Sequence, residues 1–241
     1  MLNPDDVKQR PSPNFGSRKD GKGVDMLVIH YTGMQSAEAA LERLCDTEAQ
    51  VSAHWLIEED GTLWSLVAEE MRAWHAGHSF WRGETDINSR SVGIELVNPG
   101  HEFGYRPFPE AQVQRLIGLC SGIVKTYAIP PDHVLGHSDV APDRKVDPGE
   151  LFPWRRLAEA GIGLLPEDRS PGRAQVRKSA DEPDQARAKQ LLAEIGYATE
   201  NLSASIGAFQ RRYRQDRVDD VLDHQTMGLI EALHSRLRPL A

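Results

Sequence analysis

The chain has 241 residues, of which 39% are hydrophobic and 27% are charged, and its formal net charge at pH 7 is -8. This length and composition are typical of a globular protein with one large domain or two unequal ones. The negative charge argues against nucleic acid as the main partner, because phosphate contacts need clustered Lys and Arg. No apolar run approaches the length of a transmembrane helix, so we expect no membrane partner either.

Strands and helices are expected to alternate along the first two thirds of the chain. Residues 26–29 are wholly apolar, which is typical of a strand buried on both faces. This strand ends at His30, where polar side chains can emerge into a site. The other expected elements, in chain order, are an extended arm over 1–24, a helix over 36–50 capped by Ser36, a hairpin of 51–57 and 62–67 turning at Asp60-Gly61, a strand over 91–97, a helix opened by Pro109, a short strand at 134–135 and a helix over 151–160. Together they predict an α/β domain over 25–165, with a mixed central sheet and helices on its faces.

Three regions depart from this alternation. Residues 71–88 are irregular, too polar for a core segment and too aromatic for a plain loop. Residues 166–183 are rich in Arg, Ser, Pro and Gly, which predicts a linker. After the linker, three short amphipathic patterns predict a small three-helix domain over 184–241, near the lower size limit for an independent core.

The two cysteines and the N-terminus bear on the compartment. Cys45 and Cys120 are too few for a disulfide framework, and each falls in a helical apolar pattern that favours a buried, unreactive thiol. The first 25 residues are polar and contain neither the apolar segment of a signal peptide nor a cysteine that could carry a lipid. We therefore expect a cytoplasmic protein, unless the chain has been trimmed.

Residues 136–149, with the sequence GHSDVAPDRKVDPG, concentrate the chemistry of the chain. His137, Lys145 and Asp147 lie here among turn-forming Gly and Pro residues. In an extended backbone Lys145 and Asp147 would share one face. Buried charges need a partner or a metal to offset their desolvation, which favours a metal site. The alternative is a solvated loop with an exposed ion pair.

A His/His/carboxylate set could hold a catalytic zinc ion. Such sites generally keep three protein ligands and leave one position open. His30 follows a buried strand, His137 follows a glycine in a turn-rich loop, and Asp147 lies close by. The spacing does not establish the set, and each histidine taken alone is more typical of a hydrogen-bonded structural residue than of a ligand.

Glu95 is a carboxylate inside an otherwise apolar strand, Val92-Gly93-Ile94-Glu95-Leu96-Val97. If Ile94 and Leu96 face the core, Glu95 faces the other side of the sheet, where a site could lie. The alternative is a charge on an edge strand that prevents aggregation.

These residues resemble a known family, the zinc N-acetylmuramoyl-L-alanine amidases that share their fold with peptidoglycan recognition proteins. The similar blocks, in order over residues 26–155, are Ile29-His30, Val51-Ser52-Ala53-His54, Ala73-Trp74-His75-Ala76-Gly77, Gly93-Ile94-Glu95-Leu96 and the whole stretch 136–149. Residues 184–238, with Ala208-Phe209-Gln210 at their centre, resemble the three-helix peptidoglycan-binding domain that often follows such amidases.

The resemblance implies one Zn²⁺ per chain, ligated by His30, His137 and Asp147. Lys145 would stabilise the oxyanion of the tetrahedral intermediate, and Glu95 would act as general base and then as general acid. The bond cleaved would join the lactyl group of N-acetylmuramic acid to L-alanine of the stem peptide. Non-catalytic recognition proteins of this fold typically lack one or more zinc ligands, whereas every position is filled here, which favours an enzyme.

The resemblance also implies residues that contact the substrate. Trp74 and His75 would line the cleft, and the backbone of Ala141 would touch the peptide. Trp74 could instead pack as local core, and His54 is expected to brace the pocket. Some relatives carry an arginine nine residues before the catalytic glutamate, suited to a carboxylate of the substrate, where this chain has Asp86.

The expected compartment predicts the kind of substrate. Cytoplasmic relatives cleave 1,6-anhydro-muropeptides returned for recycling, and the expected absence of an export signal favours that role. The wall-binding-like C-terminal domain favours polymeric peptidoglycan, although it could remain as a scaffold that helps to shape the cleft. The alternatives are a cell-wall lysin and a muropeptide-binding module without activity. The sequence does not predict the oligomeric state.

Overall fold

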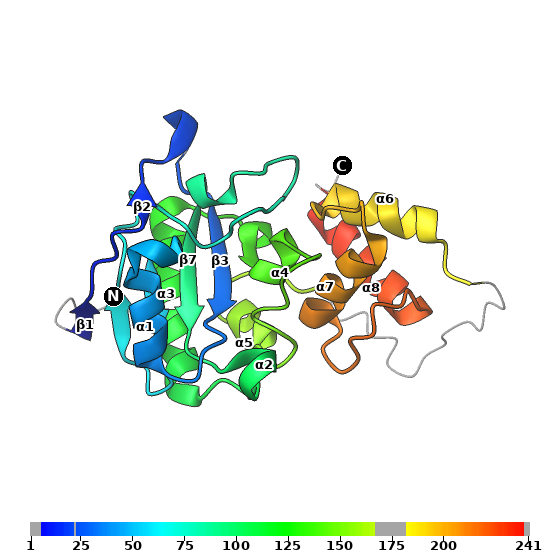
Figure 1. Ribbon diagram of the computed structural model, residues 1–241. Coiled ribbons are helices and arrows are strands. Elements are labelled where there is room, and N and C mark those ends of the chain that lie inside the picture. Colours follow the sequence, from blue (N-terminus) through cyan, green and yellow to red (C-terminus); the bar gives the residue numbers. More distant parts are fainter. Residues whose placement is uncertain (1–5, 22, 167–181, 239–241) are drawn as a thin grey trace.

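The computed structural model describes residues 6–21, 23–166 and 182–238. Most of the predicted linker and the start of the predicted arm lie outside these ranges. The centre of the molecule is a six-stranded mixed sheet in the order β1-β5-β4-β7-β3-β8 (Figure 1). Its strands are β1 (Val7–Gln9), β3 (Met26–Tyr31), β4 (Trp55–Ile57), β5 (Leu63–Ser65), β7 (Ser91–Leu96) and β8 (Val134–Gly136). Strands β2 (Phe15–Gly16) and β6 (Arg72–Ala73) form a separate antiparallel pair.

The central strands β3, β7 and β8 run parallel, and β3 pairs with both of its neighbours. The register sets Met26 opposite Ser91 and His30 opposite Glu95. Strands β4 and β5 form the predicted antiparallel hairpin, in which Gly61 adopts a φ of 87°. A glycine suits this turn because a positive φ strains other residues. The α/β fold with a mixed sheet is therefore confirmed.

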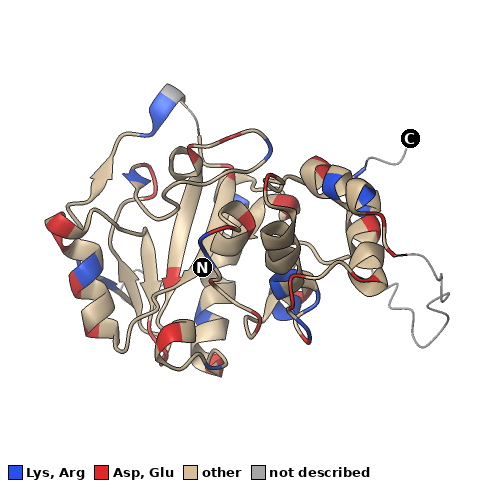
Figure 2. Ribbon diagram, turned by 45° about the vertical axis from the view of Figure 1, so that its right-hand side comes forward, with Lys and Arg blue, Asp and Glu red and all other residues tan. Residues whose placement is uncertain are grey.

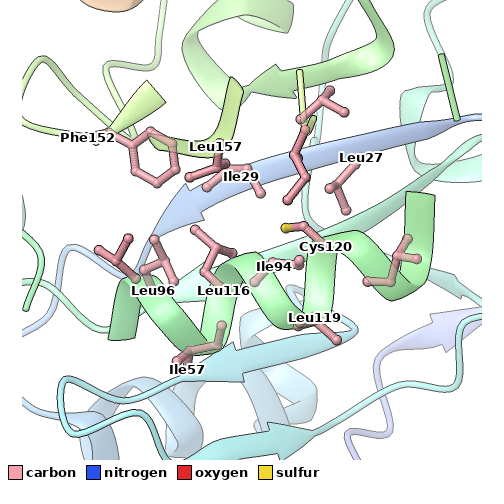
Figure 3. Packing of buried hydrophobic residues seen from close by; sticks show 14 of the residues in the cluster. Leu27, Ile29, Ile57, Ile94, Leu96, Leu116, Leu119, Cys120, Phe152 and Leu157 are labelled. Atoms are coloured by element: carbon pink, nitrogen blue, oxygen red, sulfur yellow. The ribbon is translucent and has the colours of Figure 1, made fainter. Parts of the chain in front are cut away.

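Helix α3 (Glu110–Tyr127) covers one face of the sheet, as the apolar pattern after Pro109 predicts. Figure 3 shows this core, in which Leu27, Ile29 and Ile94 of the strands pack with Leu116 and Cys120 of α3. The core continues into α5 (Trp154–Glu159), which begins after Pro153 and is shorter than the predicted helix. Cys120 is fully buried, and burial raises the pKa of its thiol, so it is not poised to react.

Helix α1 (Ala37–Cys45) packs beside the sheet and ends earlier than predicted. Ser36 caps it by accepting a hydrogen bond from the Ala39 amide at 3.1 Å. Asp46 leaves the helical conformation, and its side chain accepts from the Glu48 amide at 3.0 Å to begin a separate short 3-10 helix. Asp is a strong N-cap residue, which explains why the longer helix is wrong. Cys45, at the end of α1, is half-buried and has its pKa raised by burial.

The C-terminal helices α6 (Gln185–Ile195), α7 (Leu202–Tyr213) and α8 (His224–Leu237) form the predicted helical bundle. They share one apolar cluster with the far side of β3 and β8, where Met26, Val28 and Leu135 meet Phe209 and Leu191. Side chains alternate along β3, so Leu27 and Ile29 face α3 while Met26 and Val28 face the bundle. The helical bundle is thus packed directly onto the α/β domain, beside α4 (His137–Val140) (Figure 1).

Two predicted details differ in the observed elements. Helix α7 is capped by Asn201, whose side chain accepts from the Ala204 amide, and Ser203 lies inside the helix. Residues 137–140 form the short helix α4 within a stretch predicted as a loop. Acidic and basic residues are interspersed over both parts of the molecule (Figure 2). Among the described residues, none of the helices has the length and hydropathy needed to cross a bilayer.

Candidate metal centre and active site

Three predicted ligands, His30, His137 and Asp147, meet at the carboxyl ends of β3 and β8. His30 is the penultimate residue of β3, His137 directly follows β8, and Asp147 lies in the loop after α4. Because β3 and β8 are parallel neighbours, residues 107 positions apart in sequence reach the same edge of the sheet. His30 Nδ1 lies 2.9 Å from His137 Nδ1 and 3.3 Å from Asp147 Oδ2. His137 Nδ1 lies 3.0 Å from the same carboxylate oxygen.

This arrangement fits a tetrahedral zinc ion. Zinc bonds to imidazole and carboxylate of about 2.0–2.1 Å would place the ligand atoms about 3.3–3.4 Å apart, close to the separations observed. All three residues are buried, and they form the one candidate metal-binding group within the described ranges of the chain. Two imidazoles and a carboxylate suit zinc in a catalytic site, where a fourth position stays open.

The electrostatics favour the protonation states that bind metal. Burial lowers the pKa of His30 to about 4, so its ring is neutral near pH 7. Burial alone would raise the pKa of Asp147, but the adjacent His137 and His30 hold it well below its usual range. A neutral imidazole and an ionised carboxylate are the forms that ligate zinc.

The other nitrogen of each ligand histidine is held from behind. His30 Nε2 lies 3.0 Å from His75 Nδ1, and His75 Nε2 lies 3.1 Å from Ser91 Oγ, which donates to the Ile87 carbonyl. A consistent chain of donors results when His30 and His75 each carry their proton on Nε2, leaving His30 Nδ1 free for metal. A Cβ at Gly93 would lie 2.4 Å from the His75 ring, so the glycine makes room for this histidine.

His137 is held in the same way, because its Nε2 lies 3.2 Å from the Ala76 carbonyl. His54 lies outside the metal-binding group and fastens β7 to the segment just before β6 instead. Its Nδ1 accepts from the Gly93 amide at 2.9 Å, and its Nε2 lies 3.1 Å from the Met71 carbonyl. Burial lowers the pKa of His54 to about 3, which keeps it neutral. This geometry matches the bracing role expected of His54.

Glu95 points to the face of the sheet opposite α3 and opens onto the metal-binding group. Its neighbours Ile94 and Leu96 are buried in the α3 core, as the alternation along β7 predicts. Burial raises the pKa of Glu95 to about 8, the charge of Asp147 adds to the rise, and Lys145 opposes it. One oxygen of Glu95, Oε2, is buried without a hydrogen-bond partner within the described residues. An unsatisfied buried carboxyl is costly, which points to a chemical role over a structural one.

A pocket of about 370 Å³ contains these groups. Lys145, Glu95, His137 and Asp147 line it, together with the predicted Trp74 and His75. Further lining residues are Tyr31, Thr32, Gly33, Met34, Ala40, Arg43, Leu44, Val51, Ser52, Arg144 and Val146. Val146 therefore shares the pocket with Lys145 and Asp147, although strand alternation would have turned it away. The pocket thus brings together two residues of the metal-binding group, the basic side chain of Lys145 and a carboxyl with a raised pKa.

Ala141 does not line this pocket, and its backbone is already used. Its amide donates to the His137 carbonyl at 3.0 Å, and its carbonyl accepts from the Lys145 amide at 3.0 Å. The contact with substrate predicted for Ala141 stays a prediction.

The structure shows where two charged residues, Asp86 and Arg144, lie relative to the pocket. Asp86 does not line the pocket. Its carboxylate accepts hydrogen bonds from Arg72 Nη2 at 2.8 Å and from Ser89 Oγ at 2.8 Å. Arg144 lines the pocket beside the metal-binding group and donates through Nε to the His78 carbonyl at 2.8 Å. A single arginine in a loop has no local pattern that distinguishes it, so sequence reasoning missed it.

Comparisons with known proteins agree with the site. The family model described as N-acetylmuramoyl-L-alanine amidase matches residues 20–150. The chain is 38% identical to the N-acetylmuramoyl-L-alanine amidase AmiD of Escherichia coli over 229 residues, covering 87% of this chain and 82% of AmiD. It is 34% identical to the 1,6-anhydro-N-acetylmuramyl-L-alanine amidase AmpD of Haemophilus influenzae, over 63% of this chain and 90% of AmpD.

Two solved structures of relatives superpose over most of the chain. One is E. coli AmiD in complex with the substrate anhydro-N-acetylmuramic acid-L-Ala-D-γ-Glu-L-Lys, with a TM-score of 0.80, 36% identity, and coverage of 95% of this chain and 93% of AmiD. The other is AmpDh3 of Pseudomonas aeruginosa in complex with anhydromuramic pentapeptide, with a TM-score of 0.80, 32% identity, and coverage of 94% and 95%. The chain therefore belongs to the N-acetylmuramoyl-L-alanine amidase family of amide hydrolases.

Proposed function

We propose that the chain holds one Zn²⁺ and hydrolyses the amide between the lactyl group of 1,6-anhydro-N-acetylmuramic acid and L-alanine in soluble muropeptides. The observation that carries the proposal is the convergence of His30 Nδ1, His137 Nδ1 and Asp147 Oδ2. His137 and Asp147 line the pocket that Glu95 and Lys145 also line. When zinc is bound there, it lowers the pKa of a water molecule to about 7 and polarises the amide carbonyl.

Glu95 supplies the proton transfers. Its ionised carboxyl takes a proton from the attacking water as the new C–O bond forms, and it then gives that proton to the departing nitrogen of L-alanine. The products are the lactyl carboxylic acid and the amine of the peptide, and at neutral pH the acid gives its remaining proton to the amine or to solvent. In the metal-free chain burial raises the pKa of this carboxyl to about 8. The positive charge of a bound metal would lower that pKa toward neutrality, where one group can serve as both base and acid.

Lys145 supplies positive charge where the oxyanion develops. Its side chain is partly buried and lines the same pocket as Glu95, His137 and Asp147. A charge held in such a place stabilises the transition state more than it would in water. Trp74 offers an aromatic wall for the apolar side of a sugar ring.

The anhydro substrate is supported by the relatives, because two of them are described in complex with anhydro-muramyl peptides and another is named for the 1,6-anhydro sugar. We further propose that the enzyme works in cytoplasmic muropeptide recycling. Cell fractionation of the native producer tests this role, and recovery of the protein outside the cytoplasm would contradict it.

The function is tested by incubating the purified chain with anhydro-N-acetylmuramyl tripeptide, with and without a chelator, alongside Glu95→Gln, and following products by mass spectrometry. We expect release of free tripeptide that the chelator abolishes and that Glu95→Gln strongly reduces. Purified sacculi form the second arm. Cleavage of sacculi alone would indicate a wall lysin, and cleavage of neither substrate would leave a binding module.

A further inference from the structure

A second buried polar cluster lies on α4, two residues from His137. Asp139 is 1% exposed, and both of its carboxylate oxygens are hydrogen-bonded. Oδ2 accepts from the Gly136 amide at 2.8 Å and from Arg212 Nη1 at 2.7 Å, and Oδ1 accepts from the Tyr197 hydroxyl at 2.6 Å. Arg212 and Tyr197 belong to the C-terminal part of the chain, so the bundle supplies two of the three donors. We call Asp139, Arg212 and Tyr197 the Asp139 clamp.

Arg212 is fixed on several sides. It is 3% exposed, its Nη2 donates to the Val134 carbonyl of β8 at 2.8 Å, and its guanidinium lies 4.2 Å from the centroid of the Trp154 ring. Arg212 therefore ties β8, α4 and α5 to α7. An arginine held by two hydrogen-bonded partners and an aromatic ring keeps a defined position, unlike one in a solvated surface pair.

The clamp acts on the part of the chain that carries two proposed ligands. Helix α4 is a single turn, too short to be stable without tertiary contacts. His137 is its first residue, and the Ser138 amide donates to the Asp147 carbonyl at 2.8 Å, which links α4 to the loop of the third ligand. Whatever fixes the position of α4 thus fixes His137 and constrains Asp147.

We infer that Arg212 of α7 and Tyr197 of the loop between α6 and α7 are positioning residues for zinc, acting through Asp139 on His137 and Asp147. The inference rests on the zinc site of the proposed function. Without Arg212, Asp139 would be a buried carboxylate lacking its counter-charge, and α4 would shift to hydrate it. The H. influenzae relative matches only 63% of this chain, so much of this chain has no counterpart in that match. In this chain the bundle is a structural part of the metal site as well as an added domain.

The test measures zinc affinity and cobalt spectra in the full-length chain. Zn²⁺ dissociation constants are obtained by competition with a chromophoric chelator, and the absorption of the Co²⁺-loaded protein reports the ligand geometry. Arg212→Met should weaken zinc binding about 10- to 100-fold, the range typical of lost outer-shell support, and should shift the cobalt bands. Arg212→Lys should recover part of the loss, because it restores a positive charge.

Arg214→Met is the matched control. Arg214 is 2% exposed and pairs with Asp219 and Asp223 inside the bundle, so its loss removes a buried ion pair without touching α4. We expect Arg214→Met to lower the urea midpoint of unfolding about as much as Arg212→Met does, but to leave the zinc affinity unchanged. If Arg212→Met does not fold, Tyr197→Phe removes one hydroxyl and should weaken zinc binding several-fold.

The outcomes separate the two proposals. Wild-type zinc affinity and cobalt spectra in the folded Arg212 and Tyr197 variants would overturn the positioning role while leaving the zinc amidase in place. Equal losses of zinc affinity in Arg212→Met and Arg214→Met would also overturn it, because general destabilisation would then explain the effect. A wild-type chain that binds no zinc and cleaves no muropeptide would overturn the proposed function and this inference together.

Discussion

Helix α4 separates two buried polar clusters that differ in how completely their carboxyl groups are paired. In the Asp139 clamp one carboxylate meets one guanidinium, and both carboxylate oxygens accept hydrogen bonds from protein donors, while Nε of Arg212 has no partner among the described residues. In the metal-binding group three electron-pair donors converge within 3.3 Å, and Glu95 nearby has a buried oxygen without a partner in the described chain. A paired carboxylate stabilises a fold, whereas converging donors beside a pocket are typical of a site for a cation.

The largest expected effect comes from the unpaired carboxyl. Glu95→Gln keeps the shape of the side chain and removes its ability to take a proton, so kcat should fall about 10²- to 10⁴-fold. Zinc affinity should stay the same, because Glu95 is not one of the three converging residues. Steady-state kinetics with the anhydro-muramyl tripeptide and a zinc titration measure the two quantities. A small decrease in kcat would assign the proton transfers to another group.

Lys145→Met should have the next largest effect. The methionine fills similar space without charge, and the loss of one oxyanion-stabilising group typically lowers kcat about 10²- to 10³-fold. KM and zinc affinity should change little, since the proposed interaction forms mainly in the transition state. A variant that raised KM and kept kcat would show that Lys145 binds the ground-state substrate.

The same comparison shows what sequence reasoning can reach. The apolar run before His30 and the alternation around Glu95 are local patterns, and both correctly place their residue at the end or on the open face of a strand. The ion pair between Asp139 and Arg212 spans 73 positions in the sequence. Neither residue lies in a local pattern that predicts it. The prediction of one helix over 36–50 was wrong for a different reason. The Asp46 side chain caps a new 3-10 helix, which competes with continuation of the first helix.

The role of His75 was predictable from the sequence only in part. The sequence and the resemblance predict a residue that lines the cleft, and His75 does line the pocket. Only the packing of β7 against the 71–88 segment shows that its ring also lies over Gly93 and meets His30. A histidine can thus be assigned to a site from sequence while its partner in that site depends on tertiary structure.

His75→Phe sharpens the distinction, with a smaller expected effect than either catalytic substitution. The phenyl ring keeps the volume over Gly93 but cannot hydrogen-bond His30 Nε2, so zinc affinity should fall about 10- to 100-fold. His78→Phe is the control, because His78 is exposed in the same segment. Unchanged zinc affinity with a raised KM would make His75 a substrate contact alone.

The smallest expected effect is a change in the pH dependence of stability. His54 has a pKa of about 3 in the folded chain and about 6.5 when unfolded, so between these values the unfolded state binds one more proton. This contribution to the free energy of unfolding is complete above pH 6.5 and is lost as the pH falls, by about 1.4 kcal/mol per pH unit.

Urea unfolding of the metal-free chain between pH 7.5 and 5 should therefore have a shallower pH slope in His54→Asn than in the wild type. The asparagine can still accept from the Gly93 amide but cannot take up the proton in the unfolded state. Two other buried histidines, His30 and His75, keep their share of the slope in both proteins, because burial lowers the pKa of each. Parallel slopes would mean that His54 is not held neutral in the fold, and its role in fastening β7 to the Met71 segment would then need a different physical basis.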